Sequence, residues 1–281
     1  MGPWDPLYRK LSPEGELLTF SDLFGSGHET VCLRKVLIGA TMEINFYTHL
    51  TSPEEIEERR KLVHGFLSWV TRDLPPARPW EQLRMPPTRP ATTGEGTPLP
   101  RLLVTHRKVK TGRRLVNGEA MVDEAARVFA GKLEVVAVEW EDMSVPEQIA
   151  ASQGAHIYAG IIGTNMFNSL FMPRGSTVII IAPNGCTGVK NNFHNLAVNA
   201  NPGKCIFWEA PPDATTGRKD LDWGALRPNG TQTTSACNSQ RGVTVPLRDW
   251  LGLVNEALLD MGYAGVHDNQ LKGKGQREKH T

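Results

Sequence analysis

The sequence predicts an α/β fold in which a parallel sheet is covered by helices on both faces, and two observations support this. First, short apolar runs alternate with helix-like segments between residues 101 and 183, the order that right-handed βαβ units produce. Second, the runs are nearly continuous in Val, Ile, Leu and Ala, which is typical of strands buried on both faces.

Each element follows from a local pattern. The strand candidates of this region are, in chain order, RLLVTH (101–106), LEVVAVEW (133–140), HIYAG (156–160) and TVIIIA (177–182). The helix candidates between them are GEAMVDEAARVFAG (118–131), SVPEQIAASQ (144–153) and TNMFNSLFM (164–172). Asn117 introduces the first of these helices, and Ser144 with Glu147 has the spacing of a capping box before the second.

Further elements are expected on either side of this region. Before it, the sequence predicts a strand at 30–40 and a helix at 53–74, the latter with acids in its first turn. After it, the sequence predicts a helix around 189–198, a strand at 204–210 and a closing amphipathic helix at 246–263.

The chain divides by composition into four parts. Residues 1–75 are expected to form a partial N-terminal domain, and the proline-rich segment 76–100 a linker. Residues 101–263 are expected to form the main α/β domain, and 264–281 a flexible tail.

Composition and charge exclude several function classes. A formal net charge of +1 leaves no basic excess for nucleic-acid binding. No apolar run is long enough to span a membrane, and residues 1–16 lack the apolar core of a signal peptide. The four cysteines and eight histidines show no metal-ligand spacing, so we predict no metal and no cofactor.

The turn after the third strand candidate carries Gly160, Gly163, Thr164 and Asn165 immediately before an apolar helix. One interpretation is packing alone, with the glycines allowing a tight strand-to-helix connection. The other is that the turn and the helix N-terminus hold a phosphate through backbone N–H groups.

The loop after the first strand candidate carries a second set of candidate ligand-binding residues. It contains Arg107, Arg113 and Arg114, whose guanidinium groups make forked hydrogen bonds to phosphate oxygens. A solvated basic loop is the alternative. Since the carboxyl ends of parallel strands meet at one edge, this loop and the glycine turn are expected to form one diphosphate site.

Three segments resemble motifs of glycosyltransferase family 61. They are VTHRKVKTGRRLVNGEAM (104–121), Ser144–Ile149 and GIIGTNMFNSLFMPRGS (160–176). The family includes extracellular protein O-linked N-acetylglucosaminyltransferases and plant xylan-decorating xylosyl- and arabinosyltransferases. Looser similarity extends to the segments around 30–39 and 243–258.

The resemblance implies the C-terminal, Rossmann-like half of a two-domain GT-B glycosyltransferase, with a truncated N-terminal domain. It implies inverting, metal-independent transfer from a nucleotide sugar, with uridine diphosphate as the expected nucleotide, to a glycan or glycoprotein acceptor. Arg107 with Arg113 or Arg114 would grip the diphosphate, the turn 163–165 would receive its phosphates, and Asn168 occupies the family's Asn position. The resemblance also implies the lumen of the endoplasmic reticulum or Golgi.

Three departures from the family pattern define an alternative. The loop histidine of the family falls on Ile162 and a strand acid on Ile180, while the N-terminal Asn/His motif has no match, so no catalytic base is proposed. A degenerate member that binds a glycan or nucleotide, or supports a partner, is the alternative function. Ile162→His is expected to strengthen diphosphate binding if the imidazole can reach the phosphate. A nicotinamide-dependent oxidoreductase would need a glycine fingerprint at the first strand, which is missing.

Overall fold

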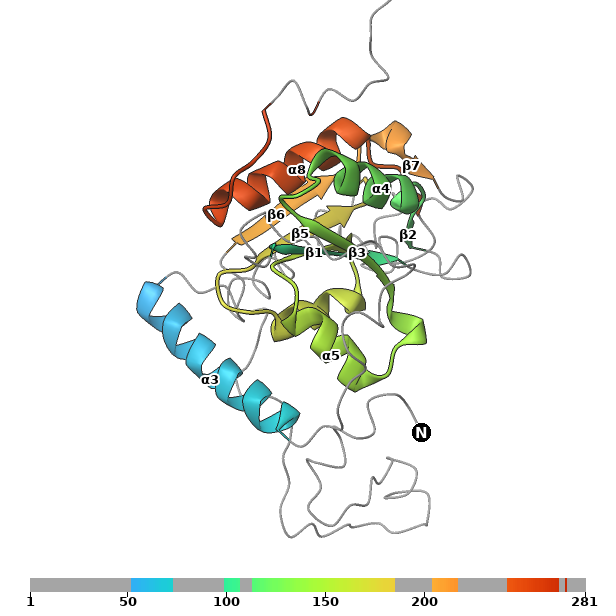
Figure 1. The fold of residues 1–281 in the computed structure, drawn as a ribbon. Helices are drawn as coiled ribbons and strands as arrows, with labels where there is room; N and C mark the ends of the chain where they lie inside the picture. The colour runs from blue at the N-terminus through green and yellow to red at the C-terminus, as the bar shows by residue number, and fades with distance from the viewer. Residues whose placement is uncertain are drawn as a thin grey trace, which may run out of the picture.

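The computed structural model describes residues 52–72, 99–106, 113–184, 204–216, 242–267 and 271. Its centre is a five-stranded sheet in which every neighbouring pair is parallel, in the order β3-β1-β4-β5-β6 (Figure 1). These strands are β1 (Arg101–His106), β3 (Glu134–Glu139), β4 (Ile157–Ile161), β5 (Thr177–Ala182) and β6 (Lys204–Glu209). The prediction of an α/β fold with a parallel sheet is therefore confirmed.

Helices cover both faces of this sheet. On one face lie α4 (Gly118–Val128) and α8 (Leu247–Asp260), and on the other lie α5 (Val145–Gln153) and the 3₁₀ helix η4 (Thr164–Phe171). Figure 1 shows α4 and α8 above the strands and α5 below them. The capping box predicted at the start of α5 is present, because the Ser144 N–H donates to the Glu147 carboxylate at 2.7 Å.

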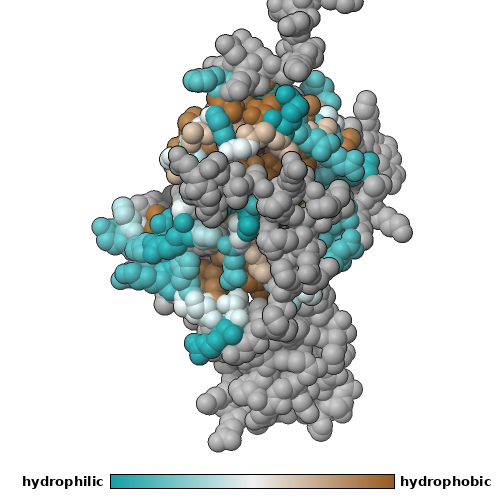
Figure 2. Space-filling view, in the orientation of Figure 1, coloured by the Kyte–Doolittle hydropathy of each residue, from teal (hydrophilic) through white to brown (hydrophobic). Residues whose placement is uncertain are grey.

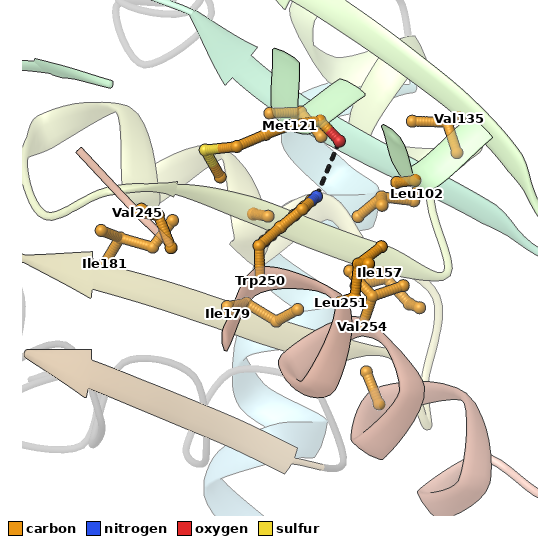
Figure 3. Packing of buried hydrophobic residues seen from close by; sticks show 14 of the residues in the cluster. Leu102, Met121, Val135, Ile157, Ile179, Ile181, Val245, Trp250, Leu251 and Val254 are labelled. Carbon is orange, nitrogen blue, oxygen red and sulfur yellow. Dashed lines mark hydrogen bonds between the residues drawn. The ribbon is translucent and has the colours of Figure 1, made fainter. Parts of the chain in front are cut away.

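The larger part of the core lies between the sheet and the α4/α8 layer. Trp250 is completely buried there, and its indole N–H donates to the Met121 carbonyl at 2.7 Å, which joins α8 to α4 (Figure 3). Alternate residues of β1, β4 and β5 reach this cluster, while the residues between them reach the α5/η4 side. The continuous apolar runs in the sequence follow from burial on both faces.

A small second sheet holds the end of the basic loop. It consists of β2 (Arg114–Leu115), β8 (Gly242–Val243) and β7 (Thr215–Thr216), with β8 in the middle. Two short 3₁₀ helices are also present, η3 (Trp140–Asp142) and η6 (Pro212–Ala214). Asn117 fixes the junction of β2 and α4, because its amide donates to the Val245 carbonyl at 2.7 Å and accepts from the Val245 N–H at 3.0 Å.

The helix predicted at 53–74 is observed as α3 (Pro53–Thr71), with Ser52 as its N-cap. Val63 and Leu67 pack against Leu170 of η4, and Arg174 pairs with Glu57 at 2.9 Å. Figure 2 shows hydrophilic residues over the outward side of α3, which carries exposed Glu and Lys side chains. The strand expected at 30–40, the linker up to residue 98 and the helix expected around 189–198 lie outside the described residues.

Two local features differ from expectation. The segment 164–172 forms a 3₁₀ helix, and within it the Ser169 hydroxyl donates to the Met166 carbonyl at 2.6 Å, a local bond of the kind that competes with regular helix geometry. Residues 264–267, which we placed in the tail, pack on the domain: Val266 is buried and its N–H donates to Asn255 Oδ1 at 2.7 Å.

Candidate functional site

The strand order places a ligand-binding edge between β1 and β4. The chain passes from β1 outward to β3 on one side and then returns to β4 on the other, so the direction of winding reverses between β1 and β4. In open α/β sheets the crevice beyond the carboxyl ends of such strands is where ligands bind. The two loops predicted from the sequence leave β1 and β4 at this point.

Gly160 serves the packing of the sheet. A Cβ at this position would lie 2.2 Å from Thr105 Oγ1, a side chain that is almost fully buried on the neighbouring strand. Glycine at position 160 therefore leaves the space that the Thr105 side chain occupies beside β4. The packing interpretation accounts for this glycine.

Gly163 brings the basic loop onto the turn. The guanidinium of Arg113 donates from Nη1 to the Ile162 carbonyl at 2.7 Å, and its Cζ lies 3.2 Å from the position that a Cβ on Gly163 would take. The expected meeting of the basic loop and the glycine turn at one sheet edge is therefore observed for Arg113. A cationic group lies directly over the start of η4.

Asn165 ties the turn to β1. Its Nδ2 donates to Thr105 Oγ1 at 3.1 Å, while its main-chain carbonyl accepts from the Tyr158 hydroxyl at 2.6 Å. Tyr158 in turn accepts from the Trp140 indole at 3.1 Å. This chain of bonds holds the backbone of the turn in place beneath Arg113.

His106, the last residue of β1, lies on the α4 side of the same edge. Its ring packs on Gly118, where an added Cβ would lie 2.5 Å from the imidazole. Burial lowers the pKa of His106, against the opposing effects of the Glu119 carboxylate and the Gly118 backbone, so the neutral form is favoured. His106 belongs to the basic loop that the sequence places at this edge, whereas Thr105 was not predicted as a site residue, although its position at the end of the first strand was an available signal.

The other predicted site residues have different surroundings. Arg114 pairs with Gly242 in the small sheet, and no described contact joins it to the turn. Asn168 is 4% exposed and donates to Gln148 Oε1 at 3.3 Å, which joins η4 to α5. Thr164 begins η4, so its N–H belongs to the helix N-terminus. Arg107 lies outside the described residues.

Ile162 and Ile180, at which the resemblance to the family implies polar residues, share one apolar cluster. Both are buried, at 0% and 1% exposure, together with Tyr158 and Met166 on the α5/η4 side of the sheet. The Ile162 side chain therefore points into the core, while its carbonyl reaches Arg113.

The described ranges contain neither a metal centre nor a membrane-spanning helix. Within these ranges, no group of three His, Cys, Asp or Glu side chains is arranged to hold a metal ion. None of the described helices combines the length and the apolar character needed to cross a membrane.

Comparison with known proteins gives the family. The family model described as Glycosyltransferase 61 matches residues 33–179, which is more than half of the 281-residue chain. A comparison with curated proteins found no significant match. The family match covers both loops of the β1/β4 edge and the helix α3. This protein belongs to glycosyltransferase family 61.

Proposed function

We propose that the protein transfers a sugar from a uridine diphosphate sugar to a hydroxyl group of a glycan or glycoprotein acceptor. Family membership supports glycosyl transfer in general. The observation that carries the donor site is the Arg113 guanidinium lying over the Gly163 turn, at the point where the winding of the sheet reverses.

The site has the electrostatics that a diphosphate requires. The first N–H groups of η4, at Thr164 and Asn165, have no acceptor within the helix. They lie at its N-terminus, the end with partial positive charge. Arg113 adds a permanent positive charge and a planar set of donors that fits two phosphate oxygens. One of those donors, Nη1, bonds to the Ile162 carbonyl, and this bond fixes the guanidinium relative to the turn.

These groups also suit the reaction. In an inverting transfer, the acceptor hydroxyl attacks the anomeric carbon while the bond to the nucleoside diphosphate breaks and its oxygen gains negative charge. Cationic and N–H donors placed at that oxygen lower the barrier because they interact most strongly with the developing charge. Arg113 and the turn would supply this compensation without a metal ion, as the family resemblance implies.

The second candidate function is binding without catalysis, and the Ile162 and Ile180 cluster favours it. At two positions where the resemblance implies polar residues, this chain has apolar, buried ones. Both functions place the donor at the same edge and differ only in turnover. For the transferase we propose the lumen of the endoplasmic reticulum or Golgi as its location.

Calorimetric titration with uridine diphosphate tests the donor site, with a nicotinamide dinucleotide as the control ligand. We expect Arg113→Ala to weaken binding by about 1.5–3 kcal/mol, roughly ten- to a hundredfold or more, because a charge-assisted contact is lost. Arg127→Ala is the matched control, since Arg127 is exposed on α4 and pairs with Glu124. Equal affinity of the two variants would contradict the proposed site.

Turnover separates the two candidate functions. A transferase should release uridine diphosphate from a uridine diphosphate sugar in the presence of an acceptor, and Arg113→Ala should slow this release. Tight donor binding with no release over any acceptor of a glycan panel would favour the binding protein.

A further inference from the structure

The side chain of Asn165 carries a buried acceptor oxygen to which no described residue donates a hydrogen bond. The residue is 8% exposed, and its Oδ1 has no hydrogen-bond partner among the described residues. Leaving such an acceptor unsatisfied costs about 1–3 kcal/mol, so a buried group of this kind requires an explanation.

The other end of the amide is paired with the neighbouring strand. Nδ2 donates to Thr105 Oγ1 at 3.1 Å, and Oδ1 lies on the side of Gly163. Oδ1 and the Arg113 Cζ each lie 3.2 Å from the point where a Cβ on Gly163 would sit. An acceptor oxygen and a guanidinium thus border the same small region, which the glycine leaves without a side chain.

These two groups call for different parts of a ligand. A guanidinium binds an anion, whereas an amide oxygen needs a donor, and no N–H of the neighbouring Arg113 bonds to Asn165 Oδ1. The oxygens of a fully ionised diphosphate ester are acceptors, so the diphosphate itself cannot satisfy Asn165 Oδ1. A ligand that meets both requirements carries a hydroxyl or N–H group close to its phosphate.

We propose that Asn165 is a specificity-determining residue whose Oδ1 accepts a hydrogen bond from a hydroxyl or N–H group of the nucleotide sugar, next to the phosphate bound by Arg113. This inference rests on the proposed function and adds the chemistry that the site selects. Thr105 acts as a positioning residue, because its hydroxyl accepts from Nδ2 and so leaves Oδ1 on the side of the ligand. A site built this way rejects ligands that lack the donor, since its buried acceptor then stays unpaired.

The test compares ligands that differ in donors, titrated at pH 8 by calorimetry. Methyl diphosphate has the charged group alone, uridine diphosphate adds the ribose hydroxyls and the base N–H, and uridine diphosphate xylose adds sugar hydroxyls. We expect Asn165→Ala to lower the preference for a donor-bearing ligand over methyl diphosphate about tenfold, while affinity for methyl diphosphate changes little. A loss seen with uridine diphosphate assigns the donor to the nucleoside, and a loss seen only with the xylose derivative assigns it to the transferred sugar.

Two further substitutions keep the test decisive. Asn165→Asp retains an acceptor but adds a negative charge beside Arg113, so all three affinities should fall together while the preference among ligands remains. Thr105→Val should reduce the preference, and Thr105→Ser, which keeps the hydroxyl, should restore it. Thermal unfolding of each variant verifies that it is folded.

The failures are distinguishable. If the parent protein binds uridine diphosphate but Asn165→Ala changes all three affinities equally, or none of them, the role of Asn165 is wrong and the proposed function stands. If the parent protein binds none of the three ligands, both are overturned.

Discussion

Ile162→His tests whether a family motif can be restored in this chain. At the sequence level this change is expected to return a hydrogen-bond donor to the diphosphate loop. The structure predicts the opposite result, because the Ile162 side chain is fully buried in the apolar cluster that also contains Ile180 and Met166. Its backbone carbonyl accepts from Arg113 at the site, while its N–H donates to the Ile181 carbonyl of the neighbouring strand.

The magnitude follows from two contributions. Removing a fully buried isoleucine side chain forfeits about 1.5–3 kcal/mol of apolar burial. Placing an imidazole there without a hydrogen-bond partner adds about 1–3 kcal/mol. We therefore expect Ile162→His to lower the free energy of unfolding by about 2.5–6 kcal/mol, a large share of the 5–15 kcal/mol of a typical domain.

Urea denaturation measures the loss of stability, and titration of the folded fraction measures binding. Ile162→Val is the matched control, since it removes one methyl group from the same cluster and should cost only about 0.5–1.5 kcal/mol. We expect no gain in affinity for uridine diphosphate from the histidine. A His variant as stable as the Val variant, or one that binds uridine diphosphate more tightly than the parent, would refute this reasoning.

The remaining predictions concern two glycines and the pH dependence of stability. Gly160→Ala should lower stability by about 1–3 kcal/mol, because its Cβ would lie 2.2 Å from Thr105 Oγ1. Gly252→Ala in α8, with open space around it, should raise stability by about 0.5–1 kcal/mol, and equal effects of the two changes in urea denaturation would contradict this. For His156, burial and then the charge of Arg101 lower the pKa, and its Nδ1 accepts from the Arg101 N–H at 3.2 Å. The unfolded chain therefore binds more protons between the ordinary pKa of about 6.5 and the lower folded value, so stability should fall as the pH drops through this interval and stay level above it. His156→Phe should reduce this slope in unfolding measurements between pH 5 and 8, and an unchanged slope would contradict the assignment.

The strands were predictable because their pattern is local. A run such as Thr177–Ala182, buried at every position, identifies an inner parallel strand without any knowledge of its neighbours. The capping box of α5 is equally local, since Ser144 and Glu147 lie three residues apart. The type of helix was harder to predict, because the periodicity of 164–172 does not distinguish the observed 3₁₀ geometry of η4 from an α-helix.

The site depended on contacts between distant parts of the chain, and for that reason the sequence predicted its loops better than its residues. Arg113 and Arg114 are adjacent and chemically identical, yet only Arg113 is seen to reach the turn. Pairing of Arg114 with Gly242 in β8 decides this, and nothing near Arg114 in the sequence indicates that partner. The contact between Thr105 and Asn165 likewise requires that β1 and β4 be neighbours.

The two glycines of the turn show why packing and binding need not be alternatives. Gly160 is explained by Thr105 alone, since any side chain there would meet a buried hydroxyl. Gly163 has looser neighbours at 3.2 Å, and these are Arg113 and Asn165, the two residues to which we assign ligand binding. One glycine thus sets the distance between strands while the other leaves room between a cation and an acceptor. Because Thr105 both requires Gly160 and orients Asn165, the packing of the strands determines the direction in which the site presents its acceptor.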